Sequence, residues 1–140
     1  MITASTIGNR RPSPYHLAWR CDCCGHYLED GEGWITVDLA AVLAVQRQWS
    51  AWEAKRHEPG AVPLGELLAL PTEVPWHVYH QDCDPAPEDP AYWWTIERAR
   101  TISDVFGWWL HLSGKNWFKH TDWEGLIRER VMPQAAEVAA

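Results

Sequence analysis

The stretch RCDCCGH, residues 20–26, places three of the chain's four cysteines within four positions. The fourth, Cys83, comes much later, in HVYHQDC at residues 77–83. The first residues, MITASTIGNRRPSPY, lack the apolar run of a secretory signal, so we expect a cytoplasmic protein. Thiols stay reduced in that compartment, and a cysteine cluster there is more typical of a metal site than of a disulfide framework.

The cysteine spacing predicts one metal site. Zinc in a closed structural site is held by four ligands, usually two closely spaced pairs that the fold brings together. Cys21 and Cys24 form a C-x-x-C pair, and His80 and Cys83 form an H-x-x-C pair. Gly25 follows the first pair and suits a tight knuckle whose backbone amides turn toward the sulfurs. We therefore predict one structural Zn²⁺ bound by Cys21, Cys24, His80 and Cys83.

Other ligands compete with these four. Cys23 and His26 also have a two-residue gap, but the first pair offers two thiolates with the glycine in place. His77 would leave a longer gap to Cys83, and strand alternation puts residues 77 and 80 on opposite sides. A plainer alternative is that the cysteines are small buried hydrophobic residues and that His80 is a core histidine.

A catalytic zinc is a further alternative. Such a site has three protein ligands and a nearby carboxylate base. The chain contains no H-E-x-x-H, no H-x-E with P-C-x-x-C and no G-x-S-x-G motif. If one predicted ligand did not bind, the base of a zinc-dependent hydrolase or nuclease could come from Glu29, Asp30, Asp82 or Asp84.

Charge is distributed unevenly along the 140 residues, whose formal net charge is -7. Residues 1–20 carry three arginines and no acid, whereas residues 21–92 carry thirteen acidic residues against three basic ones. An acidic segment repels phosphate, so nucleic acid would have to contact the two ends of the chain. The length suits one domain, and no run of about eighteen apolar residues is present to span a membrane.

Three segments have the pattern of β-structure. YLEDGEGWITVD, residues 27–38, predicts a hairpin, because its turn contains two glycines and WITVD is rich in β-branched and aromatic residues. WHVYH, residues 76–80, alternates as a strand does. YWWTIERAR, residues 92–100, also alternates and is interpreted as a strand.

Four helices are expected around these strands. Asp38 can cap the first, while Thr101 with Asp104 and Thr121 with Glu124 each fit a capping box. The predicted helices cover about residues 38–57, 64–70, 102–112 and 121–131.

These elements predict an α+β fold. Its centre would be a small zinc-knuckle β-sheet of the zinc-ribbon or treble-clef kind, with a helical insertion and two C-terminal helices. The expected organisation is a flexible basic arm at 1–14, a single zinc-stabilised domain at 15–131 with the insertion at 38–74 and the helices at 101–131, and a frayed tail at 132–140.

The chain's eleven tryptophans have to serve a core, a binding face, or both. The apolar residues between Phe106 and Leu112 cannot all face one side of a short helix, so exposed aromatic anchors are expected. The candidate interface residues are Trp108, Trp109, Trp117 and Trp123. Near the C-terminus, basic residues interleaved with aromatic ones also resemble nucleic-acid binders, and the candidate contacts there are Lys115, Lys119, Arg128 and Arg130. Arg10 and Arg11 of the basic N-terminal arm are the other two candidates. Packing onto the sheet and a solvated mixed-charge surface are the plainer explanations.

Three stretches together carry a resemblance: CDCCGHYLEDGEGWITVD, PWHVYHQDCDP and ERARTISDVFGWWLHLSGKNWFKHTDWEGLI. In this order they resemble small uncharacterised zinc-binding proteins of actinobacteria and their phages, with a C-x2-C-G start, a W-x3-H-x2-C middle and an H-L-x2-K-x-W ending. The resemblance covers most of residues 20–131 and implies a zinc-ribbon or treble-clef domain with an attached helical element. It points to the same four ligands and names no activity.

The leading hypothesis from the sequence is a non-enzymatic, zinc-stabilised module that binds another protein, as a regulator in a phage or its host. A partner with a basic face would complement the acidic segment between residues 22 and 89. The alternatives are a nucleic-acid-binding protein that uses the basic arm and the C-terminal helices, and the zinc-dependent hydrolase or nuclease.

Overall fold

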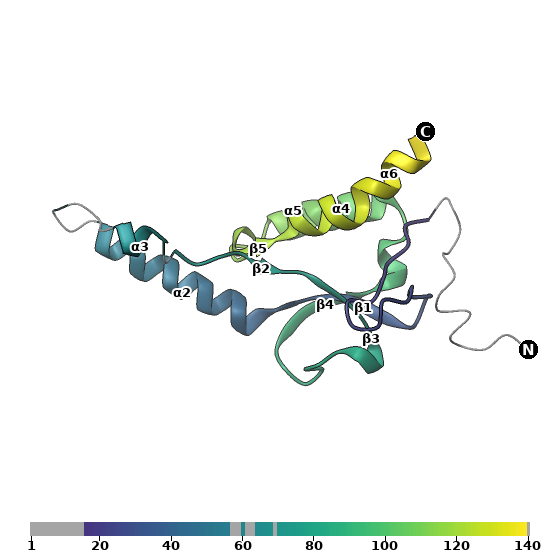
Figure 1. Ribbon diagram of the computed structural model, residues 1–140, viewed down its shortest axis with the longest axis horizontal. Coiled ribbons are helices and arrows are strands. Elements are labelled where there is room, and N and C mark those ends of the chain that lie inside the picture. The colour runs from purple at the N-terminus through teal and green to yellow at the C-terminus, as the bar shows by residue number, and fades with distance from the viewer. Residues whose placement is uncertain (1–15, 57–59, 61–63, 69, 140) are drawn as a thin grey trace, which may run out of the picture.

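The structure, a computed structural model, describes residues 16–56, 60, 64–68 and 70–139. The predicted basic arm, with Arg10 and Arg11, lies outside the described residues. The fold is mixed, with a small antiparallel sheet and several helices. Figure 1 shows α4 and the chain from α5 to α6 on one side of the strands, while α2 and α3 extend away from the sheet.

A three-stranded antiparallel sheet forms the centre, with β1 (Gly33–Asp38) between β3 (His77–His80) and β4 (Ala91–Thr95). Ile35 lies opposite Val78 on one neighbour and Trp94 on the other. All three side chains are buried, as the alternation of a half-buried strand requires. This row of residues connects the sheet to the hydrophobic core beneath the helices.

The predicted hairpin over residues 27–38 is wrong in its first strand. Tyr27 forms an isolated antiparallel bridge with Arg20 instead. The Glu32 amide donates to the Glu29 carbonyl (3.1 Å), and the Glu32 carboxylate accepts from the Glu29 amide (2.7 Å), which closes a turn. At Gly33 a Cβ would collide with the Tyr79 carbonyl oxygen. The chain therefore packs against β3, and β1 pairs with distant strands.

Two helices occupy the predicted insertion, α2 (Leu39–Arg56) and α3 (Leu64–Leu68). Asp38 caps α2 as predicted, because its carboxylate accepts a hydrogen bond from the Ala41 amide (3.1 Å). The chain then returns to the domain through β2 (Val74–Pro75), which pairs in parallel with β5 (Thr121–Asp122).

The strand predicted at residues 92–100 is shorter in the structure. β4 ends at Thr95, and a 3₁₀ turn, η2 (Ile96–Ala99), follows it. The turn is held by a hydrogen bond from Nε1 of Trp19 to the Ala99 carbonyl oxygen (2.8 Å). This contact depends on a residue far away in the sequence, which the local alternation could not reveal.

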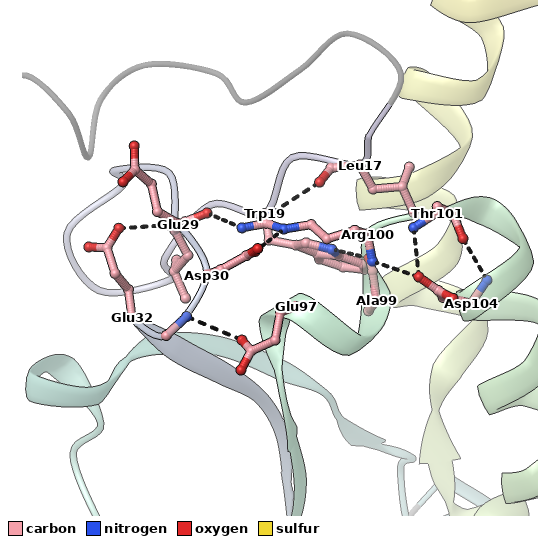
Figure 2. A network of polar contacts seen from close by, with 12 residues as sticks. Leu17, Trp19, Glu29, Asp30, Glu32, Glu97, Ala99, Arg100, Thr101 and Asp104 are labelled. Atoms are coloured by element: carbon pink, nitrogen blue, oxygen red, sulfur yellow. Dashed lines mark hydrogen bonds and ion pairs between the residues drawn. The ribbon is translucent and has the colours of Figure 1, made fainter.

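Arg100 lies at the end of η2 and is buried, with only 8% of its surface exposed. Its guanidinium donates to the carbonyl oxygens of Leu17 (3.1 Å) and Leu28 (2.8 Å) and to the Asp30 carboxylate (2.8 Å). Figure 2 labels Leu17 and Asp30 beside Arg100. One side chain thereby joins three separate parts of the fold.

The C-terminal region begins with α4 (Ile102–Ser113), and the predicted capping box of Thr101 and Asp104 is confirmed. After η3 (Phe118–His120), the structure differs from the prediction. Thr121 lies in β5, and Asp122 caps α5 (Trp123–Leu126) by accepting from the Gly125 amide (3.0 Å). The expected cap was therefore placed one residue too early.

The expectation of a frayed tail is wrong for residues 132–139. A π-helical turn, η4 (Ile127–Val131), continues from α5 into α6 (Met132–Ala139). Gln134 accepts a hydrogen bond from the Ala18 amide (2.7 Å) and donates to the Ala18 carbonyl oxygen (2.9 Å). This pair of bonds to a buried backbone holds the last helix in place.

Many tryptophans pack together in the core. The rings of Trp76 and Trp94 lie 5.3 Å apart, and each also contacts Trp123. Trp108 stacks on Trp94 at 4.1 Å, and Trp117 lies beside Trp76. The aromatic-rich C-terminal half therefore mainly fills the space between the helices and the sheet. Within the part of the chain that the structure describes, no helix is long and apolar enough to cross a bilayer.

Candidate metal centre

The first half of the candidate site is the turn that carries the first three cysteines. The Cys21 amide donates to the His26 carbonyl oxygen (2.8 Å), and the Gly25 amide donates to the Cys21 carbonyl oxygen (3.0 Å). Gly25 has a φ of 78°, a conformation that glycine adopts at little cost. The glycine after the C-x-x-C pair thus closes a tight turn, as the sequence predicts.

The second half lies at the end of β3, where η1 (Gln81–Cys83) turns the chain so that Cys83 faces back. The Asp22 amide donates to the Val78 carbonyl oxygen (2.8 Å), and the Asp22 carboxylate accepts from the Val78 amide (2.9 Å). These two bonds fix the cysteine turn on the strand that carries His80.

The four predicted ligands come together. Each of Cys21, Cys24, His80 and Cys83 offers one ligand atom, and these atoms all lie within 4.8 Å of one another. Zn–S bonds of about 2.3 Å in a tetrahedron separate two sulfurs by roughly 3.8 Å, so the spacing is compatible with one ion. Cys21 is buried, His80 and Cys83 are half-buried, and Cys24 is exposed. The cluster can hold a metal ion at the surface of the fold.

Cys21 is prepared to act as a thiolate. Burial raises the pKa of Cys21, but amide hydrogen bonds from Cys24, His80 and Cys23 outweigh this effect and lower the pKa to about 6. The amides of Cys23 and His80 each lie 3.4 Å from the Cys21 sulfur. Hydrogen bonds of this kind stabilise the charged form of the ligand.

The pKa of Cys83 is shifted in the opposite direction to that of Cys21. Burial raises its pKa, and the neighbouring Cys21 thiolate raises it further, to about 12. Two thiolates at this distance repel each other unless a cation lies between them. A divalent metal removes this repulsion, because a coordinating thiol is deprotonated outright.

His80 is oriented by groups on both sides of its ring. Its Nδ1 lies 3.2 Å from the Cys24 sulfur and so faces the cluster. Its Nε2 faces the Glu32 carboxylate at 3.7 Å. A carboxylate on the outer nitrogen is the usual way to fix a ligand histidine and increase its basicity.

Glu32 was not among the sequence candidates. Its position becomes informative only with the strand register, in which Gly33 lies opposite His80. The Glu32 carbonyl oxygen also accepts from the Gln81 amide (2.9 Å), so the turn before β1 is fixed beside the site.

The competing ligands lie outside the cluster. Cys23 is exposed; its amide donates to the Cys21 sulfur (3.4 Å), and its own side chain is hydrogen-bonded to Cys83 without belonging to the four-ligand cluster. His26 contributes a carbonyl oxygen to the turn. His77 lies 3.3 Å from the Asp22 carboxylate, on the side of β3 away from the four ligands, as strand alternation predicts.

Arg130 fastens the cysteine turn to the C-terminal helix. Its guanidinium donates to the Arg20 carbonyl oxygen (3.0 Å) and forms an ion pair with Asp22. Arg130 was a candidate nucleic-acid contact, and the structure gives this side chain a partner within the protein instead. The sequence carried no signal for this pair, whose members are far apart in the chain.

Two of the four carboxylates considered as catalytic bases make contacts elsewhere in the fold, and the other two are exposed. Asp30 pairs with Arg100 at 2.8 Å. Asp84 accepts from Nε1 of Trp34 (2.9 Å) and from the Ala86 amide (2.9 Å). Glu29 and Asp82 are exposed.

The tryptophans proposed as an interface differ in exposure. Trp109 is 40% exposed, whereas Trp108 and Trp117 are half-buried against core rings. Trp123 is only 3% exposed, so its expected role as an exposed anchor is wrong, because β2 and β5 bring it beneath Trp76. The structure exposes a set of apolar residues on α4 that the sequence did not single out as a group: Ile102, Phe106, Trp109 and Leu110.

The remaining candidate basic residues have nearby partners. Lys115 lies over the Tyr92 ring, 5.1 Å from its centre. Arg128 is 3.9 Å from the Glu124 carboxylate, and Lys119 borders a cleft that also contains acidic residues. The neighbouring acidic residues partly neutralise the positive charge that phosphate binding needs.

Comparisons with protein-family models, curated proteins and solved structures found no match to this chain. The functional argument therefore depends on the chain's own geometry. Its two main features are the Cys₃His cluster and the exposed apolar side of α4.

Proposed function

We propose that this protein is a non-enzymatic, zinc-stabilised module that binds another protein through α4. The observation that carries the proposal is that one side of α4 is apolar and exposed to solvent. The same fold could be stabilised by a metal that joins the cysteine turn to the sheet. The scaffold would belong to the zinc-ribbon or treble-clef kind, as the resemblance in sequence suggests.

Zinc is the metal that the ligand chemistry favours. Three thiolates and one imidazole are the donor set of structural Cys₃His zinc sites, whereas oxygen-rich sites suit magnesium or calcium. If all four side chains bind, the ion keeps no position for a reacting water. The proposed role of the metal is therefore to hold the cysteine turn on β3.

The binding surface is defined here as the outer side of α4, comprising Ile102, Phe106, Trp109 and Leu110. Their exposed fractions are 50%, 57%, 40% and 65%. These positions recur at helical spacing, and the opposite side of α4 packs into the core through Val105 and Leu112. A helix that is apolar on both sides is expected to have a neighbour on each.

The partner's chemistry follows from charge. The chain carries a net charge of -7, so a second copy would be repelled, whereas a protein with basic residues around an apolar contact would be attracted. Trp109 and Phe106, whose rings lie 6.4 Å apart, are suited to enter an apolar pocket on that partner. A regulator in a phage or its host would use such a surface to bind its target.

Nucleic-acid binding receives less support from the same residues. Arg130 pairs with Asp22, and Arg128 lies beside Glu124. The binding surface itself contains no basic side chain.

The test is purification of the tagged protein from its natural cells, with and without nuclease. We compare the unaltered chain with Leu110→Glu, which puts a charge in the binding surface, and with Leu64→Glu as the control. Leu64 is also a highly exposed leucine, 69% exposed, but lies on α3. We expect a stoichiometric protein that survives nuclease, is retained by Leu64→Glu and is lost from Leu110→Glu.

Elemental analysis of the purified protein should find one zinc per chain. A partner that disappears with nuclease, or one that binds Leu110→Glu as well as the unaltered chain, would contradict the proposed interface. Dimerisation that Leu110→Glu abolishes would identify a second copy as the occupant and overturn the proposal of a different protein.

A further inference from the structure

A cleft on the side of the fold away from the metal cluster has a different chemistry. It has a volume of about 750 Å³, within the range of pockets that bind small ligands. One wall is α2, through Trp49 and Glu53. The other walls are the segment before β2 and the chain from η3 into β5, which contribute Glu73, His120 and Asp122.

The cleft carries an excess of negative charge. Three carboxylates border it, those of Glu53, Glu73 and Asp122, against one ammonium group, that of Lys119. Burial raises the pKa of Glu73, and the charges of Asp122 and Glu124 raise it further. The carboxylates thus repel one another, and a cation between them would relieve that repulsion.

His120 supplies an independent indication of a ligand. It is only 8% exposed and borders the same cleft. Among the described residues, the fully buried side-chain nitrogens without a hydrogen-bond partner belong to Trp76, Trp94 and Trp123, so the His120 ring is instead accessible from the cleft that it lines. Burial lowers the pKa of His120 and the charge of Lys119 lowers it further, which together outweigh the opposite effect of the Glu53 carboxylate. A neutral imidazole beside the carboxylates can accept a hydrogen bond from a ligand.

An aromatic ring completes the site. Trp49 is half-buried in the wall of the cleft, and its ring meets that of Trp52 at 5.5 Å in an edge contact. An indole next to carboxylates is a common arrangement for holding a positively charged group by cation–π attraction together with charged hydrogen bonds.

We propose that this cleft binds an organic cation, a guanidinium or ammonium group, between Glu53, Glu73 and Asp122, with His120 as an additional acceptor. A metal ion fits less well. Among the described residues, the group whose ligand atoms are close enough together to hold a metal is the Cys₃His cluster, and the carboxylates of the cleft do not form such a group. An anion would be repelled by the three carboxylates. The site lies on elements other than the α4 binding surface, so this proposal is independent of the proposed function.

Such a group can come from a free polyamine or from an arginine or lysine side chain of a protein segment. The two sources share the same chemistry, and separate probes distinguish them. We use spermidine for the free cation and the blocked tripeptide Gly-Arg-Gly for the protein segment. Blocked Gly-Cit-Gly, in which neutral citrulline replaces arginine, is the matched neutral probe.

The experiment titrates the full, zinc-loaded chain with each probe, and records both binding heat and the NMR signals of the His120 ring. We expect spermidine, the arginine peptide, or both to shift these signals, and the citrulline peptide to leave them unchanged. The double variant Glu53→Gln/Glu73→Gln should bind about tenfold more weakly or worse, since each lost charged hydrogen bond is costly. Both glutamates are exposed, so the fold should tolerate the change.

Glu88→Gln is the charge control, because Glu88 is exposed and does not border the cleft. If the double variant melts at a lower temperature, Glu53→Gln alone replaces it. The proposal is overturned if no cationic probe shifts the His120 signals at millimolar concentration, or if citrulline binds as well as arginine. Equal weakening by Glu88→Gln would also overturn it, since binding would then follow net charge and not the cleft.

Discussion

At the scale of single residues, the spacing of cysteines and histidines in the sequence predicted the metal ligands, but it did not predict the residues that orient those ligands. The two short gaps in the sequence predicted the four side chains that the structure brings together. They did not predict Glu32 or the Asp22–Arg130 pair, because these depend on strand register and on a contact between distant segments. Local spacing selects ligands, whereas tertiary structure selects the groups that orient them.

Cys24 and Cys23 offer a direct comparison of adjacent thiols. Replacing Cys24 by Ser removes one ligand and should abolish stoichiometric zinc, with a loss of about 4 kcal/mol or more in the free energy of unfolding. Cys23→Ser keeps the amide that donates to the Cys21 sulfur and should retain both metal and stability. Elemental analysis and urea denaturation measure the two quantities. Similar behaviour of the two variants would contradict the ligand assignment.

Glu32 should increase the zinc affinity of the site, because its carboxylate lies beside Nε2 of the ligand His80. Glu32→Gln removes the negative charge beside Nε2 and should weaken zinc affinity by about 10-fold to 100-fold. Glu29→Gln is the matched control in the same turn, because the Glu29 side chain is exposed and lies outside the cluster. Competition with a chromogenic chelator gives the affinities. An unchanged affinity in Glu32→Gln would mean that the carboxylate does not orient the histidine.

At the scale of elements, the sequence predicted those features whose causes are local. Asp38 and the Thr101–Asp104 box start helices where expected, because capping involves neighbours in the chain. Strand pairing was predicted less well, since β1 pairs with β3 and β4 and not with the preceding residues. The last helix was missed because a side chain in it contacts a residue that is distant in the sequence.

Gln134 provides that contact. Gln134→Ala leaves the amide and carbonyl of buried Ala18 without partners, which should cost about 2 kcal/mol and loosen α6. Hydrogen exchange should become faster at the Ala18 amide and along residues 132–139. Gln48→Ala, at an exposed position on α2, is the control and should change neither. Equal protection of α6 in both variants would disprove the tether.

At the scale of the whole molecule, few residues connect the sheet, the cysteine turn and the helices. Arg100 is the clearest case, because one guanidinium binds residues 17, 28 and 30, of which Figure 2 labels Leu17 and Asp30. A hydrophobicity pattern cannot predict such a residue, since an arginine in a sequence is expected at the surface.

Arg100→Leu should destabilise the whole fold. Two buried carbonyl oxygens lose their donor, so we expect a loss of about 3 kcal/mol in the free energy of unfolding. Arg98→Leu makes the same chemical change at an exposed position and should have little effect. Urea denaturation compares the two. If they unfold at the same urea concentration, the network contributes no stability.

The contacts of Gln134 and Arg130 with residues 18–22 also affect how the protein is made. A ribosome releases the three clustered thiols well before His80 and Cys83, and it releases the residues that fasten the cysteine turn later still. During synthesis these thiols therefore wait without their protein partners, open to oxidation or to the wrong metal. Zinc loading is expected only after the ribosome has released His80 and Cys83, so a nascent chain stalled before that point should fail to retain the ion.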